Sequence, residues 1–380
     1  MRLDDDELNR ATLARQLLLD RARLPVPDAV RRVLALQAQH PASPYLALWN
    51  RVADLDPAAV DAAFADGTLV KATLLRVTLH AVHRDDHAML HAALLPTLRD
   101  ARLAHARSLR SGLTAEQADA LVPGLLAHAA RPRPMADLVA WVEAAVGPPE
   151  DVWWALRRYA PLRHAPSGGP WSFGARPAFV ASGLPAAPAD AGAVAAALAT
   201  LVVRCLEAFG PASVADVARF TLVPRPRVRD AVTALGDALV RLEGPDGAVL
   251  HDVPDGLRPP AGTPAPPRLM AMWDSTLLAF DRPRVVPPAY RAAVVRTNGD
   301  VLPTLLVDGR VAGVWRSVDG GVEATSFHPL PDDAWEGLAA EARGLVALLA
   351  GREARPYGRY DHWWAKPGWP DEGEVRLLPG

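Results

Sequence analysis

The region from Val194 to about Val253 has the most regular spacing of apolar positions. It predicts an apolar helix over Val194–Phe209, a helix over SVADVARF (213–220), a helix within VPRPRVRDAVTALGDAL (223–239) and two short strands around GPDG (244–247). Helix, turn, helix and hairpin is the order of a winged helix, in which the second helix of the motif enters a major groove. We therefore predict a winged-helix unit over residues 193–253.

Two similar units are predicted upstream. Residues 111–180 contain helical patterns at 134–146 and 150–160, followed by a hairpin over LRHAPSGGPWSFG (162–174) that turns at Ser167-Gly168-Gly169. Residues 1–110 form an elaborated unit with a strand pair over Leu69–Val82. Its predicted helices are Asp4–Asp20, Pro27–Gln39 and two that run through YLALWNRV (45–52) and AAVDAAFADG (58–67). Proline- and alanine-rich stretches at Ala181–Gly192 and Val253–Pro267 are typical of linkers.

Strand patterns dominate residues 268–380. They run through RLMAMWDSTLLAF (268–280) and residues 291–316, where Asn298-Gly299 and Asp308-Gly309 are tight-turn signals. A helix follows from about Asp332 to Leu349. The aromatic tail YGRYDHWWAKPGW (357–369) is expected to pack across the sheet, with stacking on bases as the alternative. The predicted fold class is α+β, with three tandem winged-helix units in a C-shaped arrangement and a C-terminal antiparallel β-barrel.

Composition narrows the class of protein. The net charge of −2 indicates a confined basic surface if the chain binds a polyanion, and the abundance of arginine, alanine and proline is explained on composition alone by a GC-rich genome. The single cysteine, Cys205, excludes an internal disulfide framework and a thiolate metal cluster. The acidic start MRLDDDELNR is not a secretory signal, and no apolar run is expected to span a bilayer. We expect a cytoplasmic protein without a membrane partner.

Common catalytic motifs are missing from the sequence. His80, His83, His87 and His91 lack the glutamate of an HExxH helix, and the glycine pairs lack the lysine of a P-loop. No GxSxG elbow is present. We therefore expect no metal and no cofactor, and we disfavour nucleotide hydrolysis and acyl transfer.

Two glutamines remain as candidate site residues. Gln37 and Gln39 flank Ala38 near the end of a predicted helix, where residues two apart would point to nearly opposite sides. Pro41 pushes His40 out of the α region, so the helix should end around Gln39 and the two side chains could converge on one pocket. From the residues alone, a structural role is the simpler interpretation of the pair.

A family resemblance changes that interpretation. Gln-Ala-Gln followed by HPASPYLALW (40–49), then LLRVTLHAV (74–82), WDSTLLAFDR (273–282) and PTLLVDGRVAGVWR (303–316), resembles the AlkZ-type winged-helix DNA glycosylases over nearly the whole chain. The resemblance implies three winged helices around DNA, a β-barrel, and Gln37 and Gln39 as the catalytic pair. Glutamine at both positions matches the branch that unhooks crosslinks formed by bifunctional alkylating natural products such as azinomycin.

The resemblance also implies a reaction and a partner. A guanine alkylated at N7 is cationic and leaves without protonation, so amides that position water against C1′ and stabilise the oxocarbenium ion are sufficient. The partner is double-stranded DNA that contains alkylated guanine or crosslinks. Candidate DNA contacts are Arg76, His80, Arg225, Arg227, Arg229 and Arg296, and for each arginine a solvated surface role is an equal alternative.

A winged-helix transcription regulator and a non-catalytic DNA-binding protein are the competing interpretations. Regulators generally carry one such unit per subunit and bind as symmetric dimers. Three dissimilar units in one chain favour a monomer that wraps one site. Only Gln37 and Gln39 argue against a catalytically silent protein.

Overall fold

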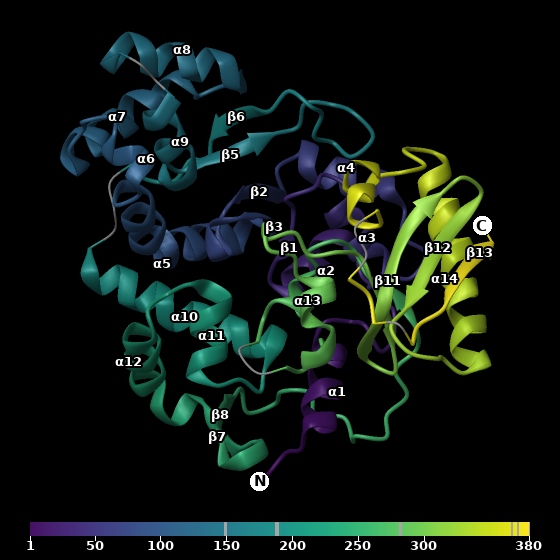
Figure 1. Cartoon of the computed structure of the whole chain (residues 1–380). Helices are drawn as coiled ribbons and strands as arrows, with labels where there is room; N and C mark the ends of the chain where they lie inside the picture. The colour runs from purple at the N-terminus through teal and green to yellow at the C-terminus, as the bar shows by residue number, and fades with distance from the viewer. Residues whose placement is uncertain (148–149, 187–189, 281–282, 366–367, 371, 380) are drawn as a thin grey trace.

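Antiparallel sheets and the helices that pack on them make up the chain (Figure 1). The computed structural model describes residues 1–147, 150–186, 190–280, 283–365, 368–370 and 372–379. Within these ranges the strands form a six-stranded sheet, a five-stranded sheet and a two-stranded ribbon. The fold is therefore a mixture of α and β structure with antiparallel sheets, as predicted.

The six-stranded sheet lies in the middle of the molecule and draws strands from both sides of residue 110. Its order is β1-β3-β2-β5-β6-β4. The strands are β1 (Leu36–Gln37), β2 (Leu69–Thr73), β3 (Leu79–His83), β4 (Arg133–Pro134), β5 (Leu162–Ala165) and β6 (Ala178–Ala181). Lys71 pairs with His164 where β2 meets β5, and this contact joins the sheet's two halves.

Helices of the first half match the predicted ones in part, since α1 and α2 start as predicted but end earlier, and α5, α6 and α7 were not predicted. The helices are α1 (Asp5–Arg15), α2 (Val26–Val33), α3 (Ser43–Trp49), α4 (Pro57–Ala65), α5 (Arg84–Leu103), α6 (Ala106–Leu109), α7 (Ala115–His128), α8 (Met135–Val146) and α9 (Glu150–Tyr159). The start of α1 is fixed by a capping box in which the Asp4 side chain accepts from the Glu7 backbone and Glu7 accepts from the Asp4 backbone. The hairpin predicted over residues 162–174 is wrong in extent, because β5 pairs with β6 beyond the Gly168-Gly169 turn.

The order predicted for residues 193–253 is present. Helices α10 (Ala191–Phe209), α11 (Val214–Thr221) and α12 (Arg225–Leu235) precede the ribbon of β7 (Val240–Glu243) and β8 (Val249–Asp252). The expectation that no apolar run could span a bilayer is corrected here. By length and composition, α10 is apolar enough to cross a membrane. Its buried residues, Leu201 and Val202 among them, belong to the protein's own core, and α10 packs against α5 and α12.

The C-terminal part is a five-stranded sheet covered by a helix. Its order is β13-β12-β11-β10-β9, formed by β9 (Arg268–Leu269), β10 (Thr304–Val307), β11 (Arg310–Val318), β12 (Gly321–Ser326) and β13 (Val375–Pro379). In the described ranges β9 and β13 do not pair, so the predicted sheet is present but is not closed into a barrel. The predicted long helix is α14 (Asp332–Ala350), whereas most of 268–280 and 291–302 is irregular or short helix, including α13 (Arg291–Val294).

Two fully buried ion pairs connect distant parts of the chain. Arg15 of α1 bonds Asp252 at the end of β8 at 2.7 and 2.9 Å. Arg51, just after α3, makes a bidentate pair with Asp274 at 2.8 and 2.9 Å. Because removing one partner of such a pair leaves a buried charge, these contacts fix the N-terminal helices against the later segments.

Candidate functional site

The helix predicted to carry the two glutamines ends earlier than expected. α2 stops at Val33, Leu34 has φ 70°, and the chain continues into β1. Gln37 pairs with His80 of β3, and the Ala38 N–H donates to the Leu79 carbonyl at 2.8 Å. The prediction of a helix to Gln39 is therefore wrong, because pairing with β3 draws these residues into the edge of the sheet.

A direct hydrogen bond brings the two glutamines together. The Gln39 backbone N–H donates to Gln37 Oε1 at 2.7 Å, and the Leu79 N–H reaches Gln39 Oε1 at 3.5 Å. Gln37 is buried, while Gln39 is exposed. Gln37 Nε2 has no hydrogen-bond partner among the described residues, so the pair presents one amide donor that is fixed in place and one side chain that solvent reaches.

His40 follows the pair directly and is neutral at ordinary pH. Its Nδ1 accepts from the Ala42 N–H at 3.2 Å, which leaves Nε2 as the protonated nitrogen. Burial, together with the charges of Arg359 and Lys71, lowers the pKa of His40 to about 4. Its ring packs edge-on against Tyr357 at a centroid distance of 5.0 Å.

His80 is not a surface residue, and its predicted role as a DNA contact is corrected. The side chain has no exposed area, because β3 lies between β1 and β2 and its outer face is covered. Burial and the Arg76 charge lower the pKa of His80 to about 3, so the ring is neutral. The Nδ1–H of this neutral ring donates to the Thr78 carbonyl at 3.1 Å. His80 therefore supports Gln37 from the neighbouring strand.

Arg76 lies at the tip of the same hairpin and points toward α11. Its guanidinium stacks on the Phe220 ring at 5.2 Å, and burial with the charge of Arg219 lowers its pKa to about 10. Arg76 has φ 52°, a left-handed conformation that is uncommon for a residue with a side chain. The hairpin tip that carries Arg76 is thus held against the third helical unit.

The other predicted arginines lie on separate elements. Arg225 and Arg229 are exposed on α12, one helical turn apart, and Arg227 is half-buried between them in sequence. Arg296 is stacked between Trp363 at 4.7 Å and Trp369 at 5.1 Å. The structure does not bring Arg296 into contact with the glutamine pair, and the aromatic tail packs against the protein as expected.

A dense basic cluster on α5, α6 and α9 was missed from the sequence. Arg102, Arg107 and Arg158 lie over Trp154 at 4.8, 5.6 and 4.8 Å. Burial and the neighbouring arginines lower the pKa of Arg158 to about 9. We call Arg102, Arg107, Arg158 and Trp154 the Trp154 cluster. In the sequence, Arg157 and Arg158 near Trp154 could have indicated part of this cluster. Arg102 comes from α5, about fifty positions upstream, so its contact with Trp154 could not be seen from the sequence.

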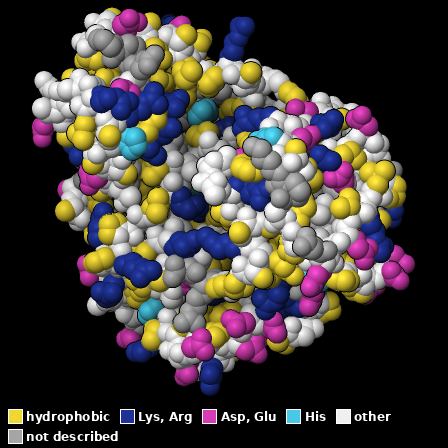
Figure 2. All heavy atoms as spheres, in the orientation of Figure 1, with side chains coloured by type: hydrophobic (Ala, Val, Ile, Leu, Met, Phe, Trp, Pro, Cys, Tyr) yellow, Lys and Arg dark blue, Asp and Glu magenta, His cyan; other side chains and the backbone are white. Residues whose placement is uncertain are grey.

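Basic side chains surround a hollow in the face shown in Figure 2. The hollow lies between the half that holds α9 to α12 and the half that holds the five-stranded sheet, and the densest group of blue atoms covers α6 and α9 (Figures 1 and 2). Basic groups around a concave surface favour a polyanionic ligand. The protein therefore has a confined basic surface, as expected, although its net charge is −2.

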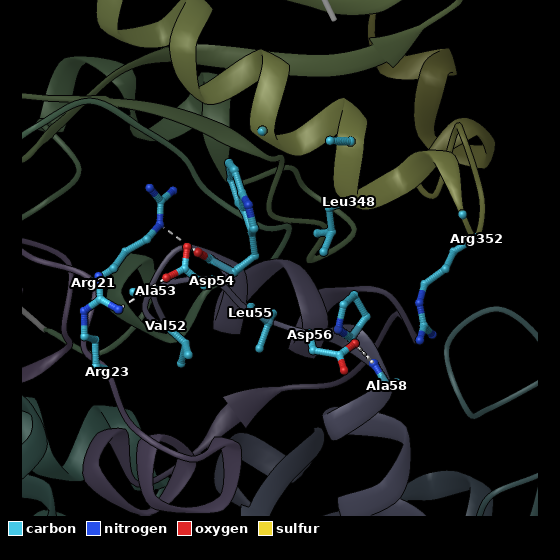
Figure 3. Close-up of a pocket in the computed structure, with 15 residues that line it drawn as sticks. Arg21, Arg23, Val52, Ala53, Asp54, Leu55, Asp56, Ala58, Leu348 and Arg352 are labelled. Atoms are coloured by element: carbon cyan, nitrogen blue, oxygen red, sulfur yellow. Dashed lines mark hydrogen bonds and ion pairs between the residues drawn. The ribbon is translucent and has the colours of Figure 1, made fainter.

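A cavity lies elsewhere in the described part of the chain. It has a volume of about 730 Å³ and lies between the segment that joins α3 to α4 and the end of α14 (Figure 3). Its charged side chains are already paired, since Arg23 faces Asp54 and Arg352 bonds Asp61. No three His, Cys, Asp or Glu side chains among the described residues are arranged to hold a metal ion. We therefore take the glutamine pair, and not this cavity, as the candidate site.

Two uncharged amides together with a basic, concave face are compatible with an enzyme that acts on nucleic acid without an ionised base. Comparison with known proteins agrees, because residues 30–348 match the model of the family described as DNA glycosylase AlkZ-like. The chain belongs to this family and is a DNA glycosylase with DNA as its substrate. Family membership favours the enzyme over a transcription regulator.

Two relatives from Streptomyces sahachiroi support the assignment. An interstrand DNA cross-link repair glycosylase is 29% identical over 336 residues, which cover 83% of this chain and 88% of the relative. The solved structure of the S. sahachiroi DNA glycosylase AlkZ matches with a TM-score of 0.79 at 23% identity, covering 93% of this chain and 98% of that one. The structural match establishes the shared fold.

Proposed function

We propose that this DNA glycosylase hydrolyses the N-glycosidic bond of N7-alkylguanine and also unhooks interstrand crosslinks of the azinomycin type. The crosslink substrate is supported by the name of the Streptomyces relative, an interstrand DNA cross-link repair glycosylase. The wide hollow in Figure 2 also favours it, because a guanine tethered to the opposite strand does not enter a closed pocket easily. DNA repair and self-resistance would be its role in the cell.

The observation that carries this proposal is that neither imidazole ring beside the glutamines is protonated. The His40 and His80 rings beside the pair are neutral, since burial lowers their pKa to about 4 and about 3. Neither ring is an effective proton donor to a leaving base at neutral pH. A base that is already cationic needs no such donor, and N7-alkylguanine is a base of this kind.

We assign different roles to the two glutamines. Gln37 is buried and bonded to the Gln39 backbone at 2.7 Å, so we propose that it positions its neighbour and directs its free amide N–H groups toward the sugar or phosphate. Gln39 is exposed, so we propose that its side chain orients the water that attacks C1′. Both act through fixed dipoles, and no proton needs to be stored on either residue.

DNA binding is proposed to use two groups of arginines around the hollow. Arg225 and Arg229 are exposed at the start of α12, where the second helix of a winged helix would enter a groove. The dense basic group in Figure 2 covers α6 and α9, the helices that carry Arg107 and Arg158 of the Trp154 cluster. The helices and hairpin of residues 193–253 support a winged-helix assignment for this part of the chain, and we expect the enzyme to act as a monomer.

Release of N7-methylguanine from methylated duplex DNA, measured by chromatography, tests the reaction. We expect release without added metal or cofactor, and a loss of at least about a hundredfold in rate for Gln39→Ala and for Gln37→Ala at nearly unchanged duplex affinity. Gln117→Ala is the matched control, because this exposed glutamine only caps α7. A crosslinked duplex should be converted to separable strands by the same enzyme.

Three outcomes would contradict the proposal. The absence of any released base would remove the reaction itself. An equal loss of affinity and rate in the glutamine variants would show that the pair is structural. A covalent complex trapped by borohydride would show that an amine, and not water, attacks the sugar.

A further inference from the structure

His80 carries a buried hydrogen-bond acceptor that has no partner. The side chain has no exposed area, and its Nδ1–H donates to the Thr78 carbonyl at 3.1 Å. A neutral imidazole has one donor and one acceptor, so Nε2 is the acceptor in this tautomer. Nε2 is fully buried and receives no hydrogen bond from the described residues. Because an unpartnered buried acceptor costs free energy, we looked for a donor that could reach it.

The strand register places Gln37 beside this acceptor. Gln37 of β1 lies directly opposite His80 of β3. Ala38 donates its N–H to the Leu79 carbonyl, which makes the next two opposed residues a hydrogen-bonded pair. The pair of Gln37 and His80 is then of the non-hydrogen-bonded kind, in which Cα atoms are about 4.5 Å apart. Side chains of such a pair leave the same face of the sheet and lie within reach of one another.

The neighbours of His80 on the other side offer no donor. Ala72 of β2 lies opposite His80, and Val70 and Val82 follow on the same face. All three side chains are buried and apolar. Of the residues that face His80 from β1 and β2, only Gln37 therefore has a side chain that can donate to it.

The Gln37 amide has a free donor. Its Oε1 accepts from the Gln39 N–H at 2.7 Å, which distinguishes the amide oxygen from the nitrogen. Nε2 then carries two N–H groups, and none of the described residues accepts from either of them. We propose that one of these N–H groups donates to His80 Nε2 in the complex with DNA, while the other faces the sugar or phosphate. The inference rests on the proposed role of Gln37 in the reaction.

This hydrogen bond would make His80 a positioning residue. Dipoles stabilise a developing charge best when they are already oriented, and an amide that is bonded at both ends cannot turn. Hydrogen bonds in active sites are often incomplete in the free enzyme and tighten when the substrate binds. Burial lowers the pKa of His80 to about 3, so the ring remains neutral and Nε2 remains an acceptor at neutral pH.

Two substitutions of His80 separate this role from a structural one. Glutamine can place an oxygen near the position of Nε2, whereas asparagine can place an N–H near the position of Nδ1 and leaves the Nε2 position empty. His80→Gln should therefore release N7-methylguanine from methylated duplex at nearly the wild-type rate. His80→Asn should keep the bond to Thr78 and lower the single-turnover rate about tenfold, which corresponds to one hydrogen bond. In a Gln37→Ala background, His80→Asn should have no further effect.

His164→Phe is the matched control. Burial lowers the pKa of His164 to about 3, so this ring is also neutral. His164 lies opposite Lys71, which lies opposite Ala81, and this row continues to Leu36. Its side chain therefore leaves the sheet on the face opposite to Gln37. The substitution should leave the rate of base release unchanged.

Nitrogen NMR of enzyme labelled at histidine tests the hydrogen bond without any base release. The His80 Nε2 signal, assigned by its absence in His80→Gln, should be that of an unprotonated nitrogen in the free enzyme. A duplex that contains a tetrahydrofuran abasic-site analogue should move this signal toward the position of a protonated nitrogen, because Nε2 then accepts a hydrogen bond. In Gln37→Ala the same duplex should leave the signal in place.

Several results would overturn the inference. A wild-type Nε2 signal that does not move when DNA is bound does so, and this result requires no variant to fold. Normal base release by His80→Asn with impaired release by His80→Gln does so as well, because only the bond to Thr78 would then matter. Independent effects of His80→Asn and Gln37→Ala would also contradict it. Failure of the proposed function is seen separately, since the wild type would then release no base whatever the NMR signal does.

Discussion

Replacement of Lys71 by methionine should change the pH dependence of folding stability. Burial lowers the pKa of Lys71 to about 8 from its ordinary 10.5. The folded state therefore binds fewer protons than the unfolded chain between these values, and stability must rise with pH across that window. Below about pH 8 the cost of charging the buried amine is fully present. Methionine has a similar length and no charge, so Lys71→Met removes the cost.

The magnitude follows from the two pKa values. Each pKa unit corresponds to about 1.4 kcal/mol, so the full cost is on the order of 3 kcal/mol. At about pH 7.5 nearly all of it remains, and at about pH 9.5 roughly half of it has been relieved. The wild type should therefore gain about 2 kcal/mol relative to Lys71→Met over this range. The contact of the ammonium with Phe173 is lost as Lys71 loses its proton, and its effect on the pH dependence is already contained in the pKa of the folded state.

Urea unfolding followed by tryptophan fluorescence measures this difference. Wild type and Lys71→Met are unfolded at the two pH values, and the change of the variant is subtracted from the change of the wild type. The subtraction removes the titration of tyrosines and other groups that both proteins share. Parallel pH profiles for the two proteins would refute the reasoning, because Lys71 would then be paired or hydrated in the fold.

Three further predictions concern other contacts. Asp274→Asn should lower the free energy of unfolding by about 3–5 kcal/mol in urea titrations, because its arginine partner stays buried without a counter-charge. Gly309→Ala should lower the thermal midpoint more than Gly299→Ala, since both have positive φ but only the first places a Cβ against α1, at 2.4 Å. The double variant Arg102→Gln, Arg158→Gln should reduce the salt slope of duplex binding by about 2 and leave base release at saturating enzyme unchanged.

Local signals in the sequence were sufficient for most helices and hairpins. α11 follows from its Ser213 cap and apolar spacing, and the hairpin of β10 and β11 follows from Asp308-Gly309. The sequence did not predict the irregular backbone in 268–280. This conformation depends on the Asp274 side chain, which pairs with Arg51 and caps the Thr276 N–H. An ion pair between residues more than 200 positions apart leaves no periodicity to detect.

The candidate site was identified from motif resemblance, but its geometry required the fold. β1 has only two residues and exists because β3, some forty positions later, supplies its partners. A segment this short has no alternation that distinguishes it from the end of a helix. His80 was assigned to the DNA surface for the same reason, since a strand's inner position in a sheet depends on neighbours that are distant in sequence.

The charge that develops in the reaction needs a counter-charge, and the site indicates where it comes from. Cleavage moves positive charge from the base to the sugar, and the oxocarbenium ion then needs nearby negative charge or oriented oxygen dipoles. Among the described residues neither Gln37 nor Gln39 hydrogen-bonds to a carboxylate. The amide oxygens supply only partial charge, so the phosphates that every nucleotide of the substrate carries are the source of full negative charge that we propose for the reaction.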